Sequence, residues 1–275
     1  MVKLMQTLPL TEEDKKIAET LSRIKYKIAI LSGKGGTGKT TVTVNIAQTL
    51  ANMGYNVGVL DADITGPNVP LMFGVEDDNM SSQDEKIQPV MAETVRIVSM
   101  EFLLQDKKSA IIWRGPMKIK ALKQLLADVN WGELDFLIVD LPPGSSDEPL
   151  SIVQTIKDLD GMVVVTTPQN VSLLDVTKSI NFAQVTKTPV IGIVENMSGF
   201  ICPHCNETTY IFKKDGGKTM AEEFSLDFLG AIPLFSQICE AGDKGRPAVL
   251  LNNQVKDIFQ RLVKKILEKI EIEKS

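Results

Sequence analysis

The residues with the clearest chemical meaning form a single run, GKGGTGKT, at positions 33–40. This run, called the phosphate loop below, fits the pattern G-x-x-x-x-G-K-[ST], in which a glycine-rich loop holds nucleotide phosphates. Glycines let backbone N–H groups approach phosphate oxygens, Lys39 can reach the β- and γ-phosphates, and the Thr40 hydroxyl suits Mg²⁺. We therefore assign nucleotide contacts to the following consecutive residues: Gly33, Lys34, Gly35, Gly36, Thr37, Gly38, Lys39, Thr40 and Thr41.

Lys34 is a second cation in this loop, at a position where the general pattern does not require one. A lysine close to the γ-phosphate would stabilise the negative charge that is redistributed during phosphoryl transfer. We therefore expect Lys34 and Lys39 to take part in catalysis. The alternative is that Lys34 is a solvated loop residue.

Two carboxylates follow the next apolar segment, in the order Leu60-Asp61-Ala62-Asp63. A carboxylate at this point can orient the attacking water or a water bound to Mg²⁺, as in other nucleotide hydrolases. We expect Asp63 to position the water, as the third catalytic residue, and Asp61 to support Mg²⁺ or the loop. Either aspartate could instead be only a helix cap.

A third carboxylate, Asp140, ends the apolar run 137–139 and precedes the sequence Leu-Pro-Pro-Gly144. An aspartate at the end of an apolar strand is typical of the second metal-binding motif of P-loop enzymes, where it holds Mg²⁺ through water. The backbone N–H of Gly144 could bond the γ-phosphate and respond to its loss. We expect a switch segment at residues 140–144.

Asn196 and Pro233 are the candidates for contact with the nucleotide base, because each lies at or near the end of an apolar strand. Asn196 offers a paired donor and acceptor, which suits adenine, and Pro233 could flank the ring. The guanine-reading pattern N-K-x-D is absent from the sequence, so ATP is favoured over GTP. An asparagine in an ordinary turn is the alternative.

A second chemical centre is the motif Cys202-Pro203-His204-Cys205. Two thiolates at this spacing bind soft metals, but zinc or an iron–sulfur cluster usually takes four ligands. The chain has one further cysteine, Cys239, and its single histidine lies inside the motif. A twofold dimer would supply four thiolates from two chains. Four interpretations stay open: a shared [4Fe–4S] cluster, which the ligand count favours, a bridging zinc, a thiol redox pair, and no function.

The composition describes an ordinary globular chain. Its 275 residues are 43% apolar and 24% charged, which is enough for one large α/β domain. The net charge of −5 argues against a nucleic-acid binder, which needs a basic face. No apolar run approaches the ~18 residues of a membrane span, residues 1–16 lack a signal-peptide core, and an odd number of cysteines suits a reducing compartment. We expect a cytoplasmic protein that binds neither nucleic acid nor a membrane.

Short apolar segments alternate with helical patterns along the chain. Most of these segments are apolar throughout, as strands are in a parallel sheet that is covered on both faces. The sequence therefore predicts an α/β fold with a doubly wound, mostly parallel sheet, helices on both faces, and sites at the carboxyl ends of strands. The predicted strands are 26–31, 57–60, 95–98, 136–139, 162–165, 190–194 and 228–232, and a helix is predicted over 39–53.

The remaining segments divide the chain as follows. Residues 1–22 are expected to form a helical arm with its helix start at Thr11, and 23–275 a P-loop ATPase domain with the cysteine motif as an insertion near 197–215. Residues 79–88 are polar and are predicted to be a mobile loop. The apolar stripe of 254–270 predicts a helix that docks on the sheet, with binding to a membrane surface as the alternative.

With these motifs in this order, the chain resembles the Mrp/ApbC family of iron–sulfur cluster carrier ATPases, within the MinD/ParA group whose P-loop reads K-G-G-x-G-K-T. The resemblance covers roughly residues 25–255. The combination of the phosphate loop, Trp-Arg-Gly-Pro-Met at 113–117 and Cys-Pro-His-Cys at 202–205 is specific. The other matching segments are Asp-Ala-Asp-Ile at 61–64, Gly-Pro-Asn at 66–68, Asp-Leu-Pro-Pro-Gly at 140–144, Thr-Thr-Pro-Gln at 166–169 and Asn-Met-Ser-Gly-Phe at 196–200.

The resemblance implies a slow, Mg²⁺-dependent ATPase that forms a homodimer or a related heterodimer. It also implies that Cys202 and Cys205 bind a [4Fe–4S] cluster, that the cluster passes to apo iron–sulfur proteins, and that Lys34 contacts nucleotide across the dimer interface. The chain departs from the family pattern at Ser146, where glycine is usual, and at Lys213, so we expect an altered turnover rate. A MinD-like positioning ATPase at a membrane surface is the alternative function.

Overall fold

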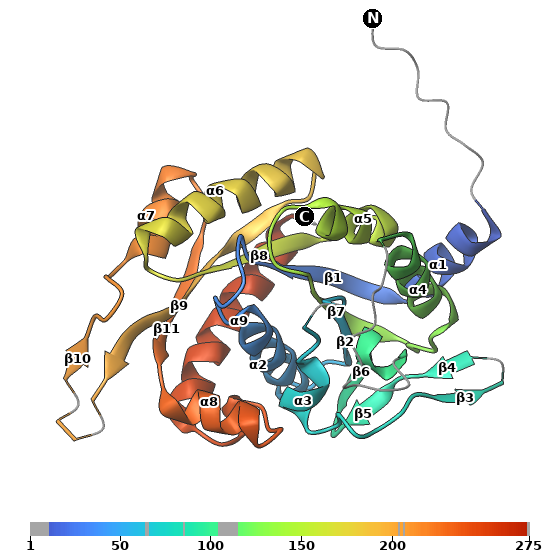
Figure 1. The fold of residues 1–275 in the computed structure, drawn as a ribbon, viewed down its shortest axis with the longest axis horizontal. Coiled ribbons are helices and arrows are strands. Elements are labelled where there is room, and N and C mark those ends of the chain that lie inside the picture. Colours follow the sequence, from blue (N-terminus) through green and yellow to red (C-terminus); the bar gives the residue numbers. More distant parts are fainter. Residues whose placement is uncertain are drawn as a thin grey trace, which may run out of the picture.

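The computed structural model describes residues 11–63, 66–84, 86–103, 115–202, 204–205 and 207–273, which build a central sheet between two layers of helices (Figure 1). Within these residues, nine strands form the main sheet in the order β10-β9-β8-β1-β7-β2-β6-β5, with β11 beside β9. Within this main sheet, only β5 and β10 of the described strands run antiparallel to their neighbours. The strands are β1 (Ile24–Leu31), β2 (Val57–Asp61), β5 (Val90–Ala92), β6 (Val95–Ser99), β7 (Leu134–Asp140), β8 (Gly161–Thr166), β9 (Val190–Ile201), β10 (Thr208–Thr209) and β11 (Phe228–Leu234).

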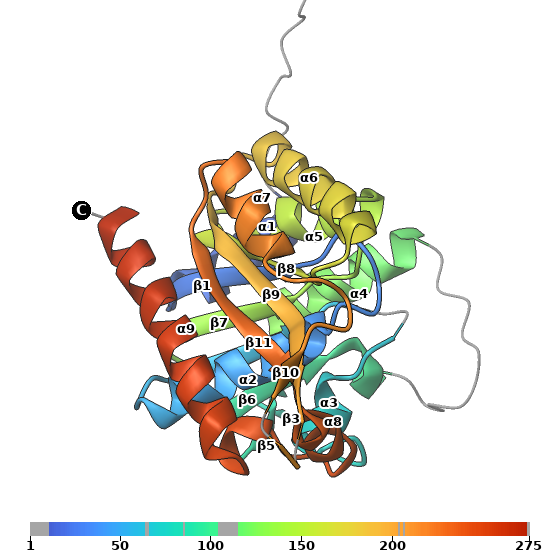
Figure 2. The same cartoon turned by 90° about the vertical axis from the view of Figure 1, so that its left-hand side faces the viewer.

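Helices cover both faces of this sheet, as predicted. Figure 2 shows the two layers on opposite sides of β9 and β11, with α9 in one layer and α7 in the other. One layer holds α2 (Lys39–Asn52), α3 (Val69–Phe73), α8 (Ser236–Asp243) and α9 (Asn253–Glu273), with the short helix η2 (Ala248–Leu250). The other holds α1 (Glu12–Ser22), α4 (Gly115–Asp128), α5 (Asp147–Ile156), α6 (Asn170–Val185) and α7 (Gly216–Glu223). The short helix η1 (Met100–Leu103) follows β6.

The central strand β1 explains why the predicted strands are apolar throughout. Ile28 and Ile30 pack into the core beneath α2 and α9, whereas Ala29 and Leu31 pack into the core on the other face. All four side chains are fully buried. Because successive residues of a strand point to opposite faces, a strand between two helix layers needs apolar residues at every position.

Each strand predicted from the sequence is present, with ends that differ by a few residues, and the helix predicted over 39–53 is α2. Strand β9 differs most, because it continues past the predicted end at 194 to Ile201 and carries the chain toward the cysteine motif. The prediction of a mobile loop over 79–88 is wrong. This segment forms an antiparallel hairpin of β3 (Ser81–Gln83) and β4 (Lys86–Gln88), whose side chains can stay polar because the pairing uses backbone groups.

Helix α1 begins where the sequence predicts. The Thr11 hydroxyl accepts the N–H of Asp14 and the Asp14 carboxylate accepts the N–H of Thr11, a reciprocal cap in which both distances are 3.1 Å. Ile17 and Leu21 are buried, and the Thr20 hydroxyl donates to the carbonyl of Ala127 at the end of α4. The described part of the expected arm therefore packs on the body of the protein, and residues 1–10 lie outside the described residues.

The apolar stripe of α9 is part of the core. Val255, Phe259, Leu262, Val263 and Ile266 are all buried, and the helix packs on α2 and β11. No helix among the described residues is long and apolar enough to cross a membrane. These contacts favour the docked interpretation of the stripe.

Replacement of Phe259 by alanine tests this packing. We expect Phe259→Ala to lower the free energy of unfolding by about 3 kcal/mol, because it leaves a cavity under a fully buried ring. Urea denaturation measures the change, and Lys264→Ala on the exposed side of α9 is the matched control, expected to stay within about 0.5 kcal/mol. Unchanged stability together with reduced flotation on liposomes would instead assign the stripe to a membrane surface.

Candidate functional site

A cavity of about 560 Å³ lies at the carboxyl ends of β1, β2, β9 and β11. Its size is that of a site for a small molecule such as a nucleotide. The phosphate loop from Lys34 onward forms one wall, and the cavity is also lined by Asp63 after β2, Asn196 within β9 and Pro233 near the end of β11. Four of the residues predicted to bind the nucleotide are not among the residues that line this cavity: Gly33, Asp61, Asp140 and Gly144. The contacts described below place these four beside or behind the phosphate loop.

The phosphate loop has the shape that its glycines predict. Gly36 and Gly38 have φ angles of 78° and 79°, in the left-handed region that favours glycine. A Cβ at Gly33 would overlap the backbone carbonyl of Asp175 in α6, so this position also admits only glycine without rearrangement. The loop joins β1 to the first turn of α2, and the helix N-terminus therefore directs its dipole at the cavity. The Thr37 hydroxyl is buried and has no hydrogen-bond partner among the described residues, which fits a loop built to take an anion.

The carboxylate of Asp140 ties the phosphate loop to the sheet. Its Oδ2 lies 2.7 Å from the Nζ of Lys39 and accepts the hydroxyl of Thr40 at 2.7 Å, and its Oδ1 accepts the hydroxyl of Thr43 at 2.5 Å. Asp140 is fully buried at the end of β7. A phosphate that binds Lys39 must therefore compete with Asp140. The Thr40 hydroxyl and the Asp140 carboxylate are oxygen ligands of the kind that Mg²⁺ prefers, so these residues fit a magnesium ion.

Asp61 supports the loop that follows β2. Its Oδ1 accepts the N–H of Asp63 at 3.2 Å, and its Oδ2 accepts the N–H of Val69 at 3.3 Å and the hydroxyl of Ser99 at 3.2 Å. Asp61 and Asp140 are register partners on neighbouring strands. Burial first, and then the negative charge of Asp140, raise the pKa of Asp61 well above its usual range, against the opposing effect of Lys39. The charged form of Asp61 is therefore disfavoured in the folded protein.

Asp63 lines the same cavity as the phosphate loop and is largely buried. Its role in positioning water stays a prediction. The N–H of Gly144 donates to the carbonyl of Ser32 at 2.8 Å, with Gly144 at a φ of 92°. The expected contact of this N–H with a γ-phosphate therefore requires the bond to Ser32 to open, and the switch role of the segment also stays a prediction.

Asn196 and Pro233 both line the cavity, on the neighbouring strands β9 and β11. The Nδ2 of Asn196 donates to the carbonyl of Thr37 in the phosphate loop at 2.8 Å, and the side chain is buried. One of the groups expected to read the base is thus occupied by the loop. Base recognition by Asn196 and Pro233 stays a prediction.

The cysteine turn, described here by Cys202, His204 and Cys205, follows β9. The N–H of Cys202 donates to the carbonyl of Glu207 at 2.9 Å, which closes the turn next to the pairing of β9 with β10. Neither cysteine forms a disulfide; Cys202 is partly exposed and Cys205 is exposed. The N–H groups of Cys205 and His204, and then the thiol of Cys205, lower the pKa of Cys202, which favours the thiolate form that binds metals. Within the described residues, no group of three His, Cys, Asp or Glu side chains is placed to hold a metal ion.

Some site residues were not predicted. Thr43 lies one turn after Lys39 on the same face of α2, and a threonine at that spacing from the loop lysine was the available signal. Ser32 and Ser99 act through contacts that join different strands and loops, so nothing local in the sequence indicated them. The predicted motif at 113–117 falls partly outside the described residues, because Trp113 and Arg114 are not described.

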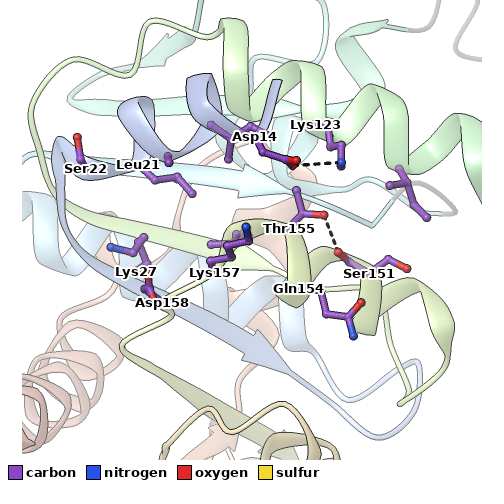
Figure 3. A pocket seen from close by; sticks show the side chains of 14 residues that line it. Asp14, Leu21, Ser22, Lys27, Lys123, Ser151, Gln154, Thr155, Lys157 and Asp158 are labelled. Atoms are coloured by element: carbon purple, nitrogen blue, oxygen red, sulfur yellow. Dashed lines mark hydrogen bonds and ion pairs between the residues drawn. The ribbon is translucent and has the colours of Figure 1, made fainter. Parts of the chain in front are cut away.

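A second hollow, of about 470 Å³, lies between α1, α4 and α5 (Figure 3). Lys123 points across it to Asp14, with 3.5 Å between Nζ and Oδ1, and the hydroxyl of Thr155 bonds the backbone of Ser151 at 2.7 Å. None of the predicted site residues lines this hollow. Since these polar groups are satisfied within the protein, we assign the site to the first cavity.

Known proteins resemble this chain over nearly its whole length. A family model described as "NUBPL iron-transfer P-loop NTPase" matches residues 23–270. The "Iron-sulfur cluster carrier protein" of Methanocaldococcus jannaschii is 51% identical over 267 residues, which cover 97% of this chain and 92% of that protein. The "Cytosolic Fe-S cluster assembly factor CFD1" of Saccharomyces cerevisiae is 45% identical over 262 residues, which cover 90% of this chain and 89% of that protein.

A solved structure shares the fold. The nucleotide-binding protein of Archaeoglobus fulgidus in complex with ADP superposes with a TM-score of 0.77 at 39% identity, covering 87% of this chain and 93% of that one. The matched range 23–270 includes both the phosphate loop and the cysteine turn. These similarities confirm the family resemblance that the motifs indicated.

The substitution Asp61→Asn tests whether the folded protein raises the pKa of Asp61. A carboxyl group has a pKa of about 3.9 in an unfolded chain, and the folded protein raises that of Asp61. Its contribution to stability is therefore complete at low pH and is lost as the pH rises through the folded-state pKa. We expect the stability of the wild type relative to Asp61→Asn to fall as the pH rises above about 4, measured by urea denaturation. A difference that grows with pH would contradict the raised pKa.

Proposed function

Because the chain belongs to the family of NUBPL iron-transfer P-loop NTPases, we propose that it is an iron–sulfur cluster carrier that binds and hydrolyses ATP. The observation that carries this proposal is the cysteine turn, where two free cysteines, one of them exposed and one partly exposed, lie at the end of the strand that also lines the nucleotide cavity. The names of its relatives, a cluster carrier and an assembly factor, support the same cargo. The acceptors are then apo iron–sulfur proteins.

The cargo is held between two copies of the chain. A [4Fe–4S] cluster takes four thiolates, and Cys202 and Cys205 of one chain supply two. A homodimer with twofold symmetry brings two cysteine turns together and completes the ligand set. The lowered pKa of Cys202 supports this role, since the thiolate is the ligand form. Zinc at the same four sulfur atoms is the competing occupant.

The nucleotide chemistry follows from the cavity. N–H groups of the phosphate loop and the Nζ of Lys39 bind the β- and γ-phosphates, and Asp63 orients the attacking water. Thr40 and Asp140 would hold Mg²⁺, which supplies charge stabilisation for the transferred phosphoryl group. Lys34 has no ion-pair partner among the described residues, lines the cavity, and is available to a nucleotide at the dimer interface.

ATP and cargo are coupled through two loop states. Nucleotide binding draws Lys39 from Asp140 and opens the bond between the Gly144 N–H and Ser32, which reorders the loops at the cavity. These loops then set the geometry of the dimer and of the four thiolates. Any effect of nucleotide on cluster retention equals a difference in affinity between the two states.

We assign residues 23–275 to the ATPase domain, with residues 197–215 as the cysteine-bearing insertion. A cytoplasmic setting is supported by the cytosolic assembly factor among the relatives. The net charge of −5 is unfavourable for nucleic acid. The positioning ATPase at a membrane is not favoured, because the α9 stripe that would bind lipid is buried in the core.

Metal analysis tests the cargo. We expect protein prepared without oxygen to contain ~2 iron and ~2 acid-labile sulfide per chain, the content of one [4Fe–4S] cluster per dimer. Cys202→Ser/Cys205→Ser should lose both, whereas Cys239→Ser, the third cysteine of the chain, should keep them. Zinc in place of iron, or no metal in any form, would refute the cluster.

Cluster release tests the coupling. We expect loaded wild-type protein to pass its cluster to an apo-ferredoxin at different rates with ATP, with ADP and without nucleotide. Lys39→Ala removes the cation that reaches the phosphates, and its release rate should not respond to nucleotide. Lys123→Ala, a lysine outside the cavity, is the control and should respond as the wild type does. Release that is the same under all these conditions would end the coupling proposal.

A further inference from the structure

The hydrogen bond from Asn196 reaches the back of a phosphate-binding peptide. Its Nδ2 donates to the Thr37 carbonyl at 2.8 Å. In a planar trans peptide the C=O and the next N–H point in opposite directions, so the N–H of Gly38 faces away from Asn196. This N–H makes no hydrogen bond to any described residue, and Gly38 lines the cavity. Asn196 therefore fixes the orientation in which the Gly38 N–H is offered to a phosphate oxygen.

The Asn196 side chain packs closely against the backbone of Gly38. A Cβ at Gly38 would overlap the Asn196 amide nitrogen, and Gly38 has a φ of 79° that only glycine adopts easily. The Asn196 side chain is 6% exposed, so water cannot replace its hydrogen bond without cost. The side chain thus lies directly against the phosphate loop.

The backbone around Asn196 is held as firmly as its side chain. The carboxylate of Glu195 accepts the hydroxyl of Ser198 at 2.5 Å and the N–H of Gly217, at the start of α7, at 2.6 Å. Between them Met197 takes a φ of 57°, an unusual value for a residue with a side chain. On the other side, Asn196 is the register partner of Ile232 in β11. These contacts join the segment to α7 and β11.

The same strand carries the cysteine turn. β9 spans Val190 to Ile201, the residue before Cys202. β11 pairs with it from Ile193 to Asn196 and again at Phe200, with a register shift between them, and β10 pairs with Phe200 and Ile201. Six residues of extended chain span at most about 20 Å. A displacement of the Thr37 peptide therefore reaches the thiols through a strand segment that is paired at both of its ends, with one register shift between them.

We propose that Asn196 is a positioning residue: it holds the Thr37–Gly38 peptide ready for phosphate, and through β9 it ties occupancy of the phosphate loop to the cysteine turn. This role differs from recognition of the base. The inference rests on the proposed function only in treating the cysteine turn as the site that binds the cluster. It concerns the chain without a cluster.

Binding of ligands with and without a base separates the two roles. We expect Asn196→Ala to weaken ADP, GDP and pyrophosphate alike, each by about tenfold, the upper range for one hydrogen bond. The preference for ADP over GDP should stay that of the wild type. Asn130→Ala, which removes an exposed asparagine far from the cavity, is the control for calorimetric titration. Loss of the ADP preference with unchanged pyrophosphate affinity would overturn the proposal in favour of base reading.

Thiol alkylation tests the link to the cysteines. In a Cys239→Ser background without cluster, saturating ADP should slow the reaction of iodoacetamide with Cys202 and Cys205. In the same background Asn196→Ala should lose this effect at ADP concentrations that still saturate it. Since no metal is present, the outcome does not depend on whether the protein carries clusters. An ADP effect that survives in Asn196→Ala, or is missing from the parent, would overturn the link.

A wild-type measurement keeps the test decisive if the variant does not fold. Hydrogen exchange of the amides from 195 to 205 should slow when ADP binds, because the strand is held by the occupied loop. Exchange that slows in the phosphate loop alone would show that β9 does not follow the nucleotide, and the proposal would fail.

Discussion

The buried carboxylate of Asp140 is the interaction on which the site depends. It lies at the end of a central strand and holds a lysine and two hydroxyls of the phosphate loop and α2 in one place. Breaking such a pair by removing one partner leaves an uncompensated buried charge, which costs about 3–5 kcal/mol. The empty loop is therefore kept in shape by the same lysine that a phosphate would claim. Binding becomes an exchange of one anion for another, rather than the burial of an unpaired cation.

The strands of the sheet could be predicted from the sequence because they are buried on both faces. Strands such as β1 and β7 are covered on both faces, and an unbroken apolar run of that length between turns is typical of a strand in a parallel sheet. The hairpin of β3 and β4 escaped prediction because its stability comes from backbone pairing and its side chains are polar and mostly exposed. A pattern of apolar side chains cannot reveal an element that is held together by backbone pairing alone.

The same distinction applies to the site. Lys39, Thr40 and Asp140 were predicted from motifs whose chemistry is local, and the structure brings them together. The support from Thr43, Ser32 and Ser99, and the bond from Asn196 to Thr37, depend on the packing of segments up to 159 residues apart. Residue type alone suggested a base contact for Asn196, because an amide can serve a base or a backbone carbonyl equally well.

The cysteine turn has a consequence for the lifetime of the empty protein. Cys205 is exposed and Cys202 is partly exposed, and the N–H groups that lower the pKa of Cys202 also raise its share of reactive thiolate. Thiolates of this kind are the first to be oxidised, and the later products of that reaction are irreversible. A bound cluster protects these sulfur atoms, whereas in a chain without a cluster they are open to oxidation. The lifetime of such a protein is therefore governed by how often it binds a new cluster, not by its free energy of unfolding.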